Sequence, residues 1–143
     1  MKFEFSAGGI VIKKTKDKNI EILVAQHSQH HGWVFPKGLI GDSIENESKE
    51  DTALREVQEE TGVVGKILQP LPEIMYWYVF EGEKIKKTVY YFLMEYVSGD
   101  ITNHDWEMEN VEWLAIDKVE ERLTYSSDKK VWKEAKKLLG EVA

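Results

Sequence analysis

The chain has 143 residues and contains no cysteine and only three prolines. Without cysteine it can form no disulfide, no thiolate metal site and no cysteine nucleophile. It also has no apolar run that approaches the about 20 residues of a membrane-spanning helix. Its first residues, MKFEFSAGGIVIKK, lack the apolar stretch and small-residue cleavage site of a secretory signal. We therefore expect a soluble, cytoplasmic protein that does not bind membranes.

Basic residues are scarcer than acidic ones. Lysine and arginine together number 19, aspartate and glutamate number 26, and the formal net charge is -7. This balance argues against a protein that binds a nucleic-acid polymer by neutralising its phosphates. Hydrophobic residues make up 42% of the chain, which is enough for a core at this length. We expect one domain over residues 1–143.

The distribution of apolar residues predicts the secondary structure. Strands are expected over residues 3–13, 20–26, 63–69, 73–81, 87–97 and 111–116. Helices are expected over residues 47–61 and 128–139, with a helical turn over 118–123 and a loop over 27–46. Asn46 or Ser48 can cap the first helix, and Gly62 can end it. This order favours an α/β fold with a mixed β-sheet sandwiched between α-helices.

The helix predicted over residues 47–61 carries an unusual cluster of acids. Glu56, Glu59 and Glu60 stand at i, i+3 and i+4 and therefore share one stripe of the helix. Like charges at this spacing destabilise an isolated helix by about 0.2–0.5 kcal/mol per pair. Hard divalent cations such as Mg²⁺ prefer carboxylate oxygens and often share them with substrate phosphates. The stripe therefore predicts a metal site that acts on phosphates.

The spacing of these acids also resembles a known motif. From Gly41 to Val63 the chain reads Gly, five residues, Glu, seven residues, Arg-Glu, an apolar residue, any residue, Glu-Glu, any residue, Gly and an apolar residue. This is the pattern of the Nudix hydrolase box. The flanking AGGIVI strand, the Trp33-x-Phe-Pro-Lys-Gly38 segment and the Glu107-x₅-Trp113 segment agree with it. The resemblance covers essentially the whole chain and implies the Nudix fold, with Mg²⁺ or Mn²⁺ as cofactor.

The resemblance implies that Glu56, Glu59 and Glu60 bind metal, together with a backbone carbonyl near the first glycine of the box. In most members that glycine belongs to the Pro-Lys-Gly sequence. Here Gly38 stands three residues too early, and Gly41 keeps the spacing of the box. We infer a three-residue insertion within 39–46, which leaves the position of the ligating carbonyl open between Lys37 and Gly41.

Other residues are assigned roles around the metal. We expect Glu47 and Arg55 to form an ion pair that orients the loop and the helix. The general base is either a glutamate of the box, such as Glu59, or a glutamate of a later loop. In the second case the resemblance favours Glu107, with the alternatives Glu109 and Glu112.

Substrate contacts are predicted from the strands that follow the box. Tyr76 and Tyr78 face one side of a strand and Trp77 the other, and aromatic faces can stack on nucleobases. The stretch from Lys87 to Tyr91 looks like that of the small bacterial diadenosine polyphosphate hydrolases, which implies that these two residues bind phosphate and base. Lys37 is a further phosphate contact. Three histidines, at positions 27, 30 and 31, are expected to line the mouth of the cleft.

Together these features predict a hydrolase of nucleoside diphosphates linked to another moiety, acting by water attack on phosphorus. The preferred substrate is a dinucleoside polyphosphate such as diadenosine tetraphosphate. Alternatives are a pyrophosphatase of oxidised nucleoside triphosphates such as 8-oxo-dGTP, and a hydrolase of ADP-ribose or diphosphoinositol polyphosphates. A catalytically silent nucleotide sensor is disfavoured because all four glutamates of the box are present. The expected partner is a small nucleotide, and the expected state a monomer or a homodimer.

Overall fold

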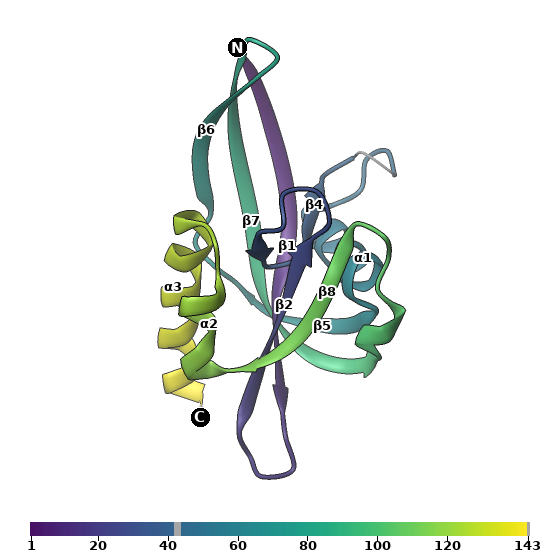
Figure 1. Ribbon diagram of the computed structural model, residues 1–143, viewed down its shortest axis with the longest axis vertical. Coiled ribbons are helices and arrows are strands. Elements are labelled where there is room, and N and C mark those ends of the chain that lie inside the picture. The colour runs from purple at the N-terminus through teal and green to yellow at the C-terminus, as the bar shows by residue number, and fades with distance from the viewer. Residues whose placement is uncertain (42–43, 143) are drawn as a thin grey trace.

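The computed structural model describes residues 1–41 and 44–142. Within these residues, eight strands form a single sheet, and helices cover both of its faces (Figure 1). The strands are β1 (Lys2–Lys14), β2 (Ile20–His27), β3 (Trp33–Val34), β4 (Lys37–Leu39), β5 (Val63–Pro70), β6 (Ile74–Phe80), β7 (Glu83–Gly99) and β8 (Met108–Ala115). The helices are α1 (Lys49–Thr61), α2 (Ile116–Arg122) and α3 (Ser126–Val142), with a 3₁₀ turn at Ile101–Asn103. No helix in the described part of the chain is both long and apolar enough to cross a membrane.

The sheet is mixed and is organised around β1. This strand pairs in parallel with β7 from Lys2 opposite Ile85 to Ile12 opposite Glu95. Every other pairing, including that of β1 with β2 and β4, is antiparallel within the described residues. The predicted mixed sheet is therefore confirmed.

Successive residues of β1 pack against different helices, because side chains alternate across a sheet. Ile10 is fully buried in the cluster that contains Trp132 of α3. Its neighbour Val11 is fully buried in the cluster that contains Ala53 and Val57 of α1. The sheet thus lies between α1 on one face and α2 and α3 on the other, as the sequence predicted.

Helix α1 begins and ends with local hydrogen bonds. The hydroxyl of Ser48 accepts a hydrogen bond from the backbone N–H of Asp51 at 3.0 Å, which satisfies one of the free donors of the first turn. Gly62 ends the helix in the left-handed region, with φ of 81°, and its N–H bonds to the carbonyl of Gln58. Both positions were predicted as caps, and Ser48 rather than Asn46 occupies the first.

Several boundaries differ from the prediction. The segment 27–46, expected to be a loop, contains β3 and β4, which are two and three residues long and too short to show an alternating pattern. Strand β7 begins at Glu83 rather than at residue 87, because the hairpin turn lies at Glu81 and Gly82, which both have positive φ. Helix α3 begins at Ser126 rather than Asp128.

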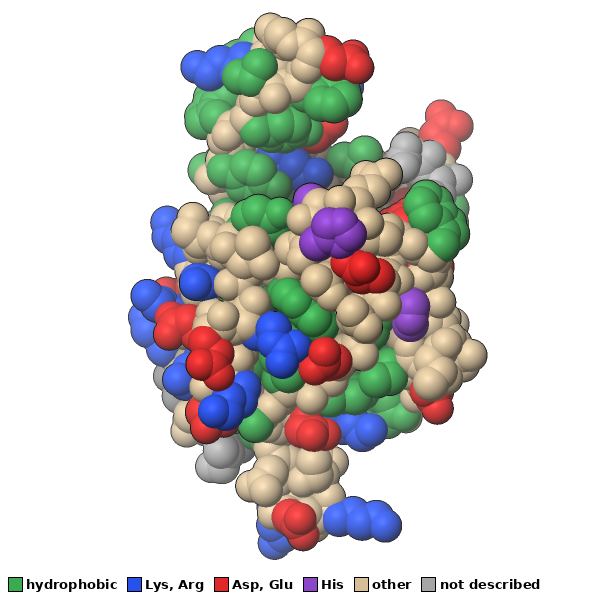
Figure 2. Space-filling view, in the orientation of Figure 1, with side chains coloured by type: hydrophobic (Ala, Val, Ile, Leu, Met, Phe, Trp, Pro, Cys, Tyr) green, Lys and Arg blue, Asp and Glu red, His purple; other side chains and the backbone are tan. Residues whose placement is uncertain are grey.

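One part of the sheet extends beyond the helices. It consists of β6, the first half of β7 and residues 2–5 of β1, and we call it the arm (Figure 1). Phe3 and Trp77 both pair with Lys86, so they share one face, and both side chains are about half exposed. Apolar side chains gather on the arm in the space-filling view (Figure 2). Tyr76 and Tyr78 are half-buried on the opposite face, which confirms the predicted alternation.

Candidate active site

The three glutamates of α1 differ strongly in their exposure. The side chain of Glu59 is 50% exposed and that of Glu56 is 12% exposed, whereas Glu60 is only 2% exposed. The Oε2 atom of Glu60 is buried and has no hydrogen-bond partner among the described residues. A buried, unpaired carboxylate oxygen is costly, so this oxygen is a candidate ligand for a cation.

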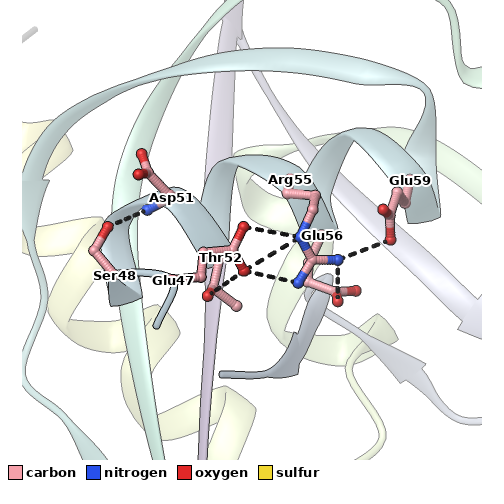
Figure 3. Close-up of polar contacts among 7 residues, drawn as sticks. All are labelled: Glu47, Ser48, Asp51, Thr52, Arg55, Glu56 and Glu59. Carbon is pink, nitrogen blue, oxygen red and sulfur yellow. Dashed lines mark hydrogen bonds and ion pairs between the residues drawn. The ribbon is translucent and has the colours of Figure 1, made fainter. Parts of the chain in front are cut away.

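Arg55 joins Glu56 and Glu59 of the helix to Glu47 in the loop before it (Figure 3). Its Nη2 lies 2.9 Å from Oε1 of Glu47, and its Nε lies 3.0 Å from Oε2 of the same residue. Its Nη1 contacts Glu56 at 3.0 Å and Glu59 at 3.1 Å. Glu47 also accepts a hydrogen bond from the hydroxyl of Thr52 at 2.7 Å. The predicted ion pair between Glu47 and Arg55 is therefore present.

The charges of this network shift the pKa values in opposite directions. The hydrogen bond from Arg55 is the main reason that the pKa of Glu47 lies below its ordinary value. Burial, and next the charge of Glu56, raise the pKa of Glu60 well above its ordinary value, while Lys37 opposes this shift. Burial also raises the pKa of Glu56, against the effect of Arg55. Two carboxylates thus crowd each other on the buried side of α1.

The two candidate glycines lie in different surroundings. A Cβ atom on Gly38 would lie 2.1 Å from the carboxyl carbon of Glu56, so only glycine lets β4 run this close to the carboxylate. Gly41 is exposed, has φ of 78°, and would meet no atom within 4 Å of an added Cβ. Gly38 is therefore the glycine that lies against the acids of α1. Asp42 and Ser43, within the segment where an insertion was inferred, lie outside the described residues.

The donor set suits a hard divalent cation, although it is not assembled for one in this conformation. No group of three or more His, Asp or Glu side chains within residues 1–41 and 44–142 is arranged to hold a metal ion. The unpaired oxygen of Glu60, the neighbouring carboxylate of Glu56 and the close backbone at Gly38 nevertheless provide the oxygen ligands that Mg²⁺ and Mn²⁺ prefer. The residues present fit such an ion.

Glu107, Glu109 and Glu112 differ in the residues that they contact. Glu107 lies close enough to Glu60 for its charge to raise the pKa of Glu60, and its backbone is fixed by hydrogen bonds from Ser28 and to Asp105. Glu109 contacts His31, and Glu112 pairs with Arg122 at 3.1 Å. Of these three candidates for the general base, Glu107 is the one placed beside the box.

A cavity of about 380 Å³ lies next to the acids, between the base of the arm and the start of α3. Three predicted substrate residues line it: Lys37, Tyr76 and Tyr91. Lys87 lies near Lys37, whose charge, after burial, lowers the pKa of Lys87. Lys87 and Tyr78 do not line the cavity; both contact Glu4, Lys87 at 3.9 Å and Tyr78 by donating a hydrogen bond. Three of the five predicted residues therefore line the cavity.

The opposite wall of the cavity contains residues that the sequence analysis did not assign. They are Tyr125, Ser126, Ser127 and Asp128. Asp128 is only 5% exposed, and its Oδ1 accepts a hydrogen bond from the hydroxyl of Tyr91 at 3.1 Å. An aspartate in the first turn of an amphipathic helix is usually explained by the helix dipole, so its position in the sequence gave no signal of a site.

The three histidines predicted at the mouth of the cleft lie at the end of β2 and in the turn that follows it. His30 lines the cavity, stacks on His27 with ring centroids 4.3 Å apart, and lies 2.8 Å from the hydroxyl of Tyr125. His31 contacts Glu109 and does not line the cavity. The prediction is thus confirmed for His30.

Comparison with known proteins yields one family and several relatives. The chain matches the NUDIX domain family over residues 3–136. MutT4 of Mycobacterium tuberculosis is 35% identical over 141 residues, which cover 95% of this chain and 56% of MutT4. The asymmetrical bis(5′-nucleosyl)-tetraphosphatase of Rattus norvegicus is 36% identical over 109 residues, which cover 75% of this chain and 72% of that protein. This chain therefore spans little more than half the length of MutT4.

Solved structures agree with the fold. The NUDIX domain of Shewanella oneidensis NrtR, determined in complex with ADP ribose, has a TM-score of 0.74 to this chain at 21% identity. The superposition covers 97% of this chain and 89% of the NrtR domain.

Proposed function

Because this chain belongs to the Nudix family, we propose that it is a metal-dependent pyrophosphohydrolase built as a single Nudix domain. It would cleave phosphoanhydride bonds in nucleoside diphosphates that are linked to another moiety. The observation that carries the proposal is the position of Lys37 and Gly38. Gly38 lies against the carboxylate of Glu56, and Lys37 lines the adjacent cavity, so one short strand joins the acids to a space for substrate.

Glu56, Glu59 and Glu60 would hold the divalent ion together with a backbone carbonyl near Gly38. When bound, Mg²⁺ or Mn²⁺ would neutralise charge on phosphoryl oxygens and lower the pKa of a coordinated water. Arg55 holds Glu47, from the loop before α1, next to Glu56 and Glu59 of α1 through five nitrogen–oxygen contacts. Its role is to position the ligands.

The residues around the acids suit the remaining steps. The charge of Lys37 acts to lower the pKa of both Glu60 and Asp128. This places Lys37 between the box and the cavity. It would bind the part of the substrate's phosphate chain that lies between the metal and the cavity. Glu107, beside Glu60, would accept the proton of the attacking water. Tyr76, which lines the cavity, would stack on a base.

The preferred substrates are dinucleoside polyphosphates such as diadenosine tetraphosphate. Support comes from the 36% identity to a bis(5′-nucleosyl)-tetraphosphatase and from the Lys87–Tyr91 stretch, whose two ends lie at the cavity and beside it. The similarity to MutT4 over 95% of the chain is the reason to keep nucleoside triphosphates, including 8-oxo-dGTP, as the second candidate.

A substrate panel tests the proposal. Diadenosine tetraphosphate, 8-oxo-dGTP, ATP and ADP-ribose are each incubated with the protein and Mg²⁺ or Mn²⁺, and the products are identified by chromatography. We expect ATP and AMP from diadenosine tetraphosphate, and no turnover in excess chelator. Metal-independent turnover, or no turnover of any of the four, would contradict the proposed activity.

A further inference from the structure

Asp128 has no role in the hydrolysis described above, although it is one of the most deeply buried acids of the described chain. It comes from the first turn of α3 and reaches the wall of the cavity. Burying a carboxylate is costly unless hydrogen bonds compensate it. The hydroxyl of Tyr91 donates to Oδ1, and this single contact leaves most of the acceptor capacity of the carboxylate available, because an ionised carboxyl has about four lone-pair sites.

The cavity is lined by one lysine and one carboxylate. Lys37, whose charge acts on Glu60 of α1 as well as on Asp128, comes from β4, and Asp128 comes from the start of α3. A phosphate is attracted to a lysine and repelled by a carboxylate, so the phosphate chain belongs beside Lys37. Near Asp128 the wall also includes Tyr76, Tyr125 and Ile74. An aromatic and apolar wall with one buried polar group is typical of a site that orients a flat ligand.

We propose that Asp128 determines specificity in this cavity by accepting a hydrogen bond from the exocyclic amino group of a nucleobase. This inference rests on the proposed function, since it takes a nucleotide as the ligand. A carboxylate can only accept hydrogen bonds. Adenine, guanine and cytosine present amino donors on their edges, whereas the corresponding oxygens of hypoxanthine and thymine are acceptors. The cavity therefore selects bases that carry an amino group.

Tyr91 is the positioning residue for this contact. Its ring is 1% exposed in the core under α3, and its edge-to-face contact with Phe35, with centroids 6.0 Å apart, fixes its orientation. Because the hydroxyl holds Oδ1, the carboxylate cannot rotate freely. Burial raises the pKa of Asp128, and Lys37 and the Tyr91 hydroxyl oppose that shift.

Binding of nucleoside monophosphates tests the inference apart from catalysis, because these compounds contain no phosphoanhydride bond. The pairs are AMP against purine riboside 5′-monophosphate, and GMP against IMP; in each pair only the first carries the amino group. Titration calorimetry in Mg²⁺ should show that wild type binds the amino member about 10- to 100-fold more tightly, as expected for a hydrogen bond to a charged group. In Asp128→Asn the two members of each pair should bind within about threefold of each other, or the preference should invert, because the new amide also donates a hydrogen bond.

Two further variants complete the experiment. Tyr91→Phe keeps the ring but frees the carboxylate, so the ratio should fall part of the way. Asp117→Asn removes an exposed acid of α2 outside the cavity, and should keep the wild-type ratio. Circular dichroism checks that each variant is folded; if Asp128→Asn is not, the wild-type and Tyr91→Phe ratios decide.

The outcomes separate the two proposals. Equal binding of both members of each pair by the wild type would overturn the role of Asp128, even if the substrate panel showed hydrolysis. A clear preference for the amino members that disappears in Asp128→Asn would support it, even if none of the panel were hydrolysed. Failure of all four monophosphates to bind would overturn it as well.

Discussion

Replacing Arg55 with alanine should destabilise the protein as well as inactivate it. The guanidinium lies within 2.9–3.2 Å of the oxygens of Glu47 and contacts Glu56 and Glu59. The side chains of Arg55 and Glu47 are only 15% and 6% exposed. Alanine would leave Glu47 with the hydroxyl of Thr52 as its remaining side-chain partner among the described residues, and water could reach it only in part.

The size of the stability loss in Arg55→Ala follows from the burial of the ion pair. Removing one partner of a buried ion pair costs about 3–5 kcal/mol, because the other charge is left uncompensated. Since Arg55 is partly exposed, we take the lower end, about 3 kcal/mol. This is a large share of the about 5–15 kcal/mol by which domains are stable. For a chain of this length it corresponds to a fall in melting temperature of about 10 °C.

The assay is thermal unfolding in chelator, followed by circular dichroism, for Arg55→Ala, Glu47→Gln and the double variant. If the cost comes from the uncompensated Glu47, the double variant should be clearly more stable than the sum of the two single changes predicts. The matched control is Arg122→Ala, whose partner Glu112 is 44% exposed, and which should lose about 1 kcal/mol or less. An unchanged melting temperature for Arg55→Ala, or strictly additive effects, would refute this reasoning.

Other predictions concern catalysis, metal and pH. Glu59→Gln should abolish most turnover but change the metal-free melting temperature by only a few degrees, since this half-exposed side chain makes a surface i,i+4 pair; a folded variant with full activity would exclude Glu59 as a ligand. Glu107→Gln should lower kcat by about 10²–10⁴-fold with little change in KM, whereas a change below threefold would move the base to the box. Mg²⁺ should raise the melting temperature of wild type but not of Glu60→Gln, in a titration from 0 to excess metal. The pKa of Asp128 is raised in the folded state, so the folded protein binds this proton more tightly than the unfolded chain does. The stability gained from the bound proton is therefore lost as pH rises from about the ordinary pKa of aspartate through the pKa in the folded state. Asp128→Asn should remove this part of the pH dependence of the unfolding free energy, and parallel stability–pH curves for wild type and variant would contradict the shift.

The sequence was sufficient for the parts of the site that lie on one element. Spacing alone placed Glu56 and Glu60 on one stripe, and in the structure the charges of Glu56 and of the cavity residue Lys37 both act on Glu60. The order of the strands and of the helix over 47–61 could also be predicted, because their apolar patterns are long. Strand β4 could not, since three residues show no period, and the choice between Gly38 and Gly41 depended on the space beside Glu56, which no local pattern reveals.

The opposite wall of the cavity was beyond prediction for another reason. Asp128 meets Tyr91 only because α3 packs across the sheet on Trp132 and Leu139. That contact joins residues 37 positions apart in sequence, and each of them looks like an ordinary helix or strand position when its own segment is read alone. Tyr91 was predicted to bind base; it lines the cavity, and its hydroxyl donates a hydrogen bond to Asp128.

The parallel pairing of β1 with β7 also sets an order of events during synthesis. β1 leaves the ribosome long before Ile85 to Glu95, its partners, have been made. In that interval its residues from Ser6 to Ile12, all buried in the final fold, can be covered only by elements that precede β7, such as β2, β4 and α1. Pairings between distant segments form slowly because a long loop must first close. A chain that stops before β7 therefore leaves one edge of β1 without its parallel partner, and unpaired strand edges favour aggregation.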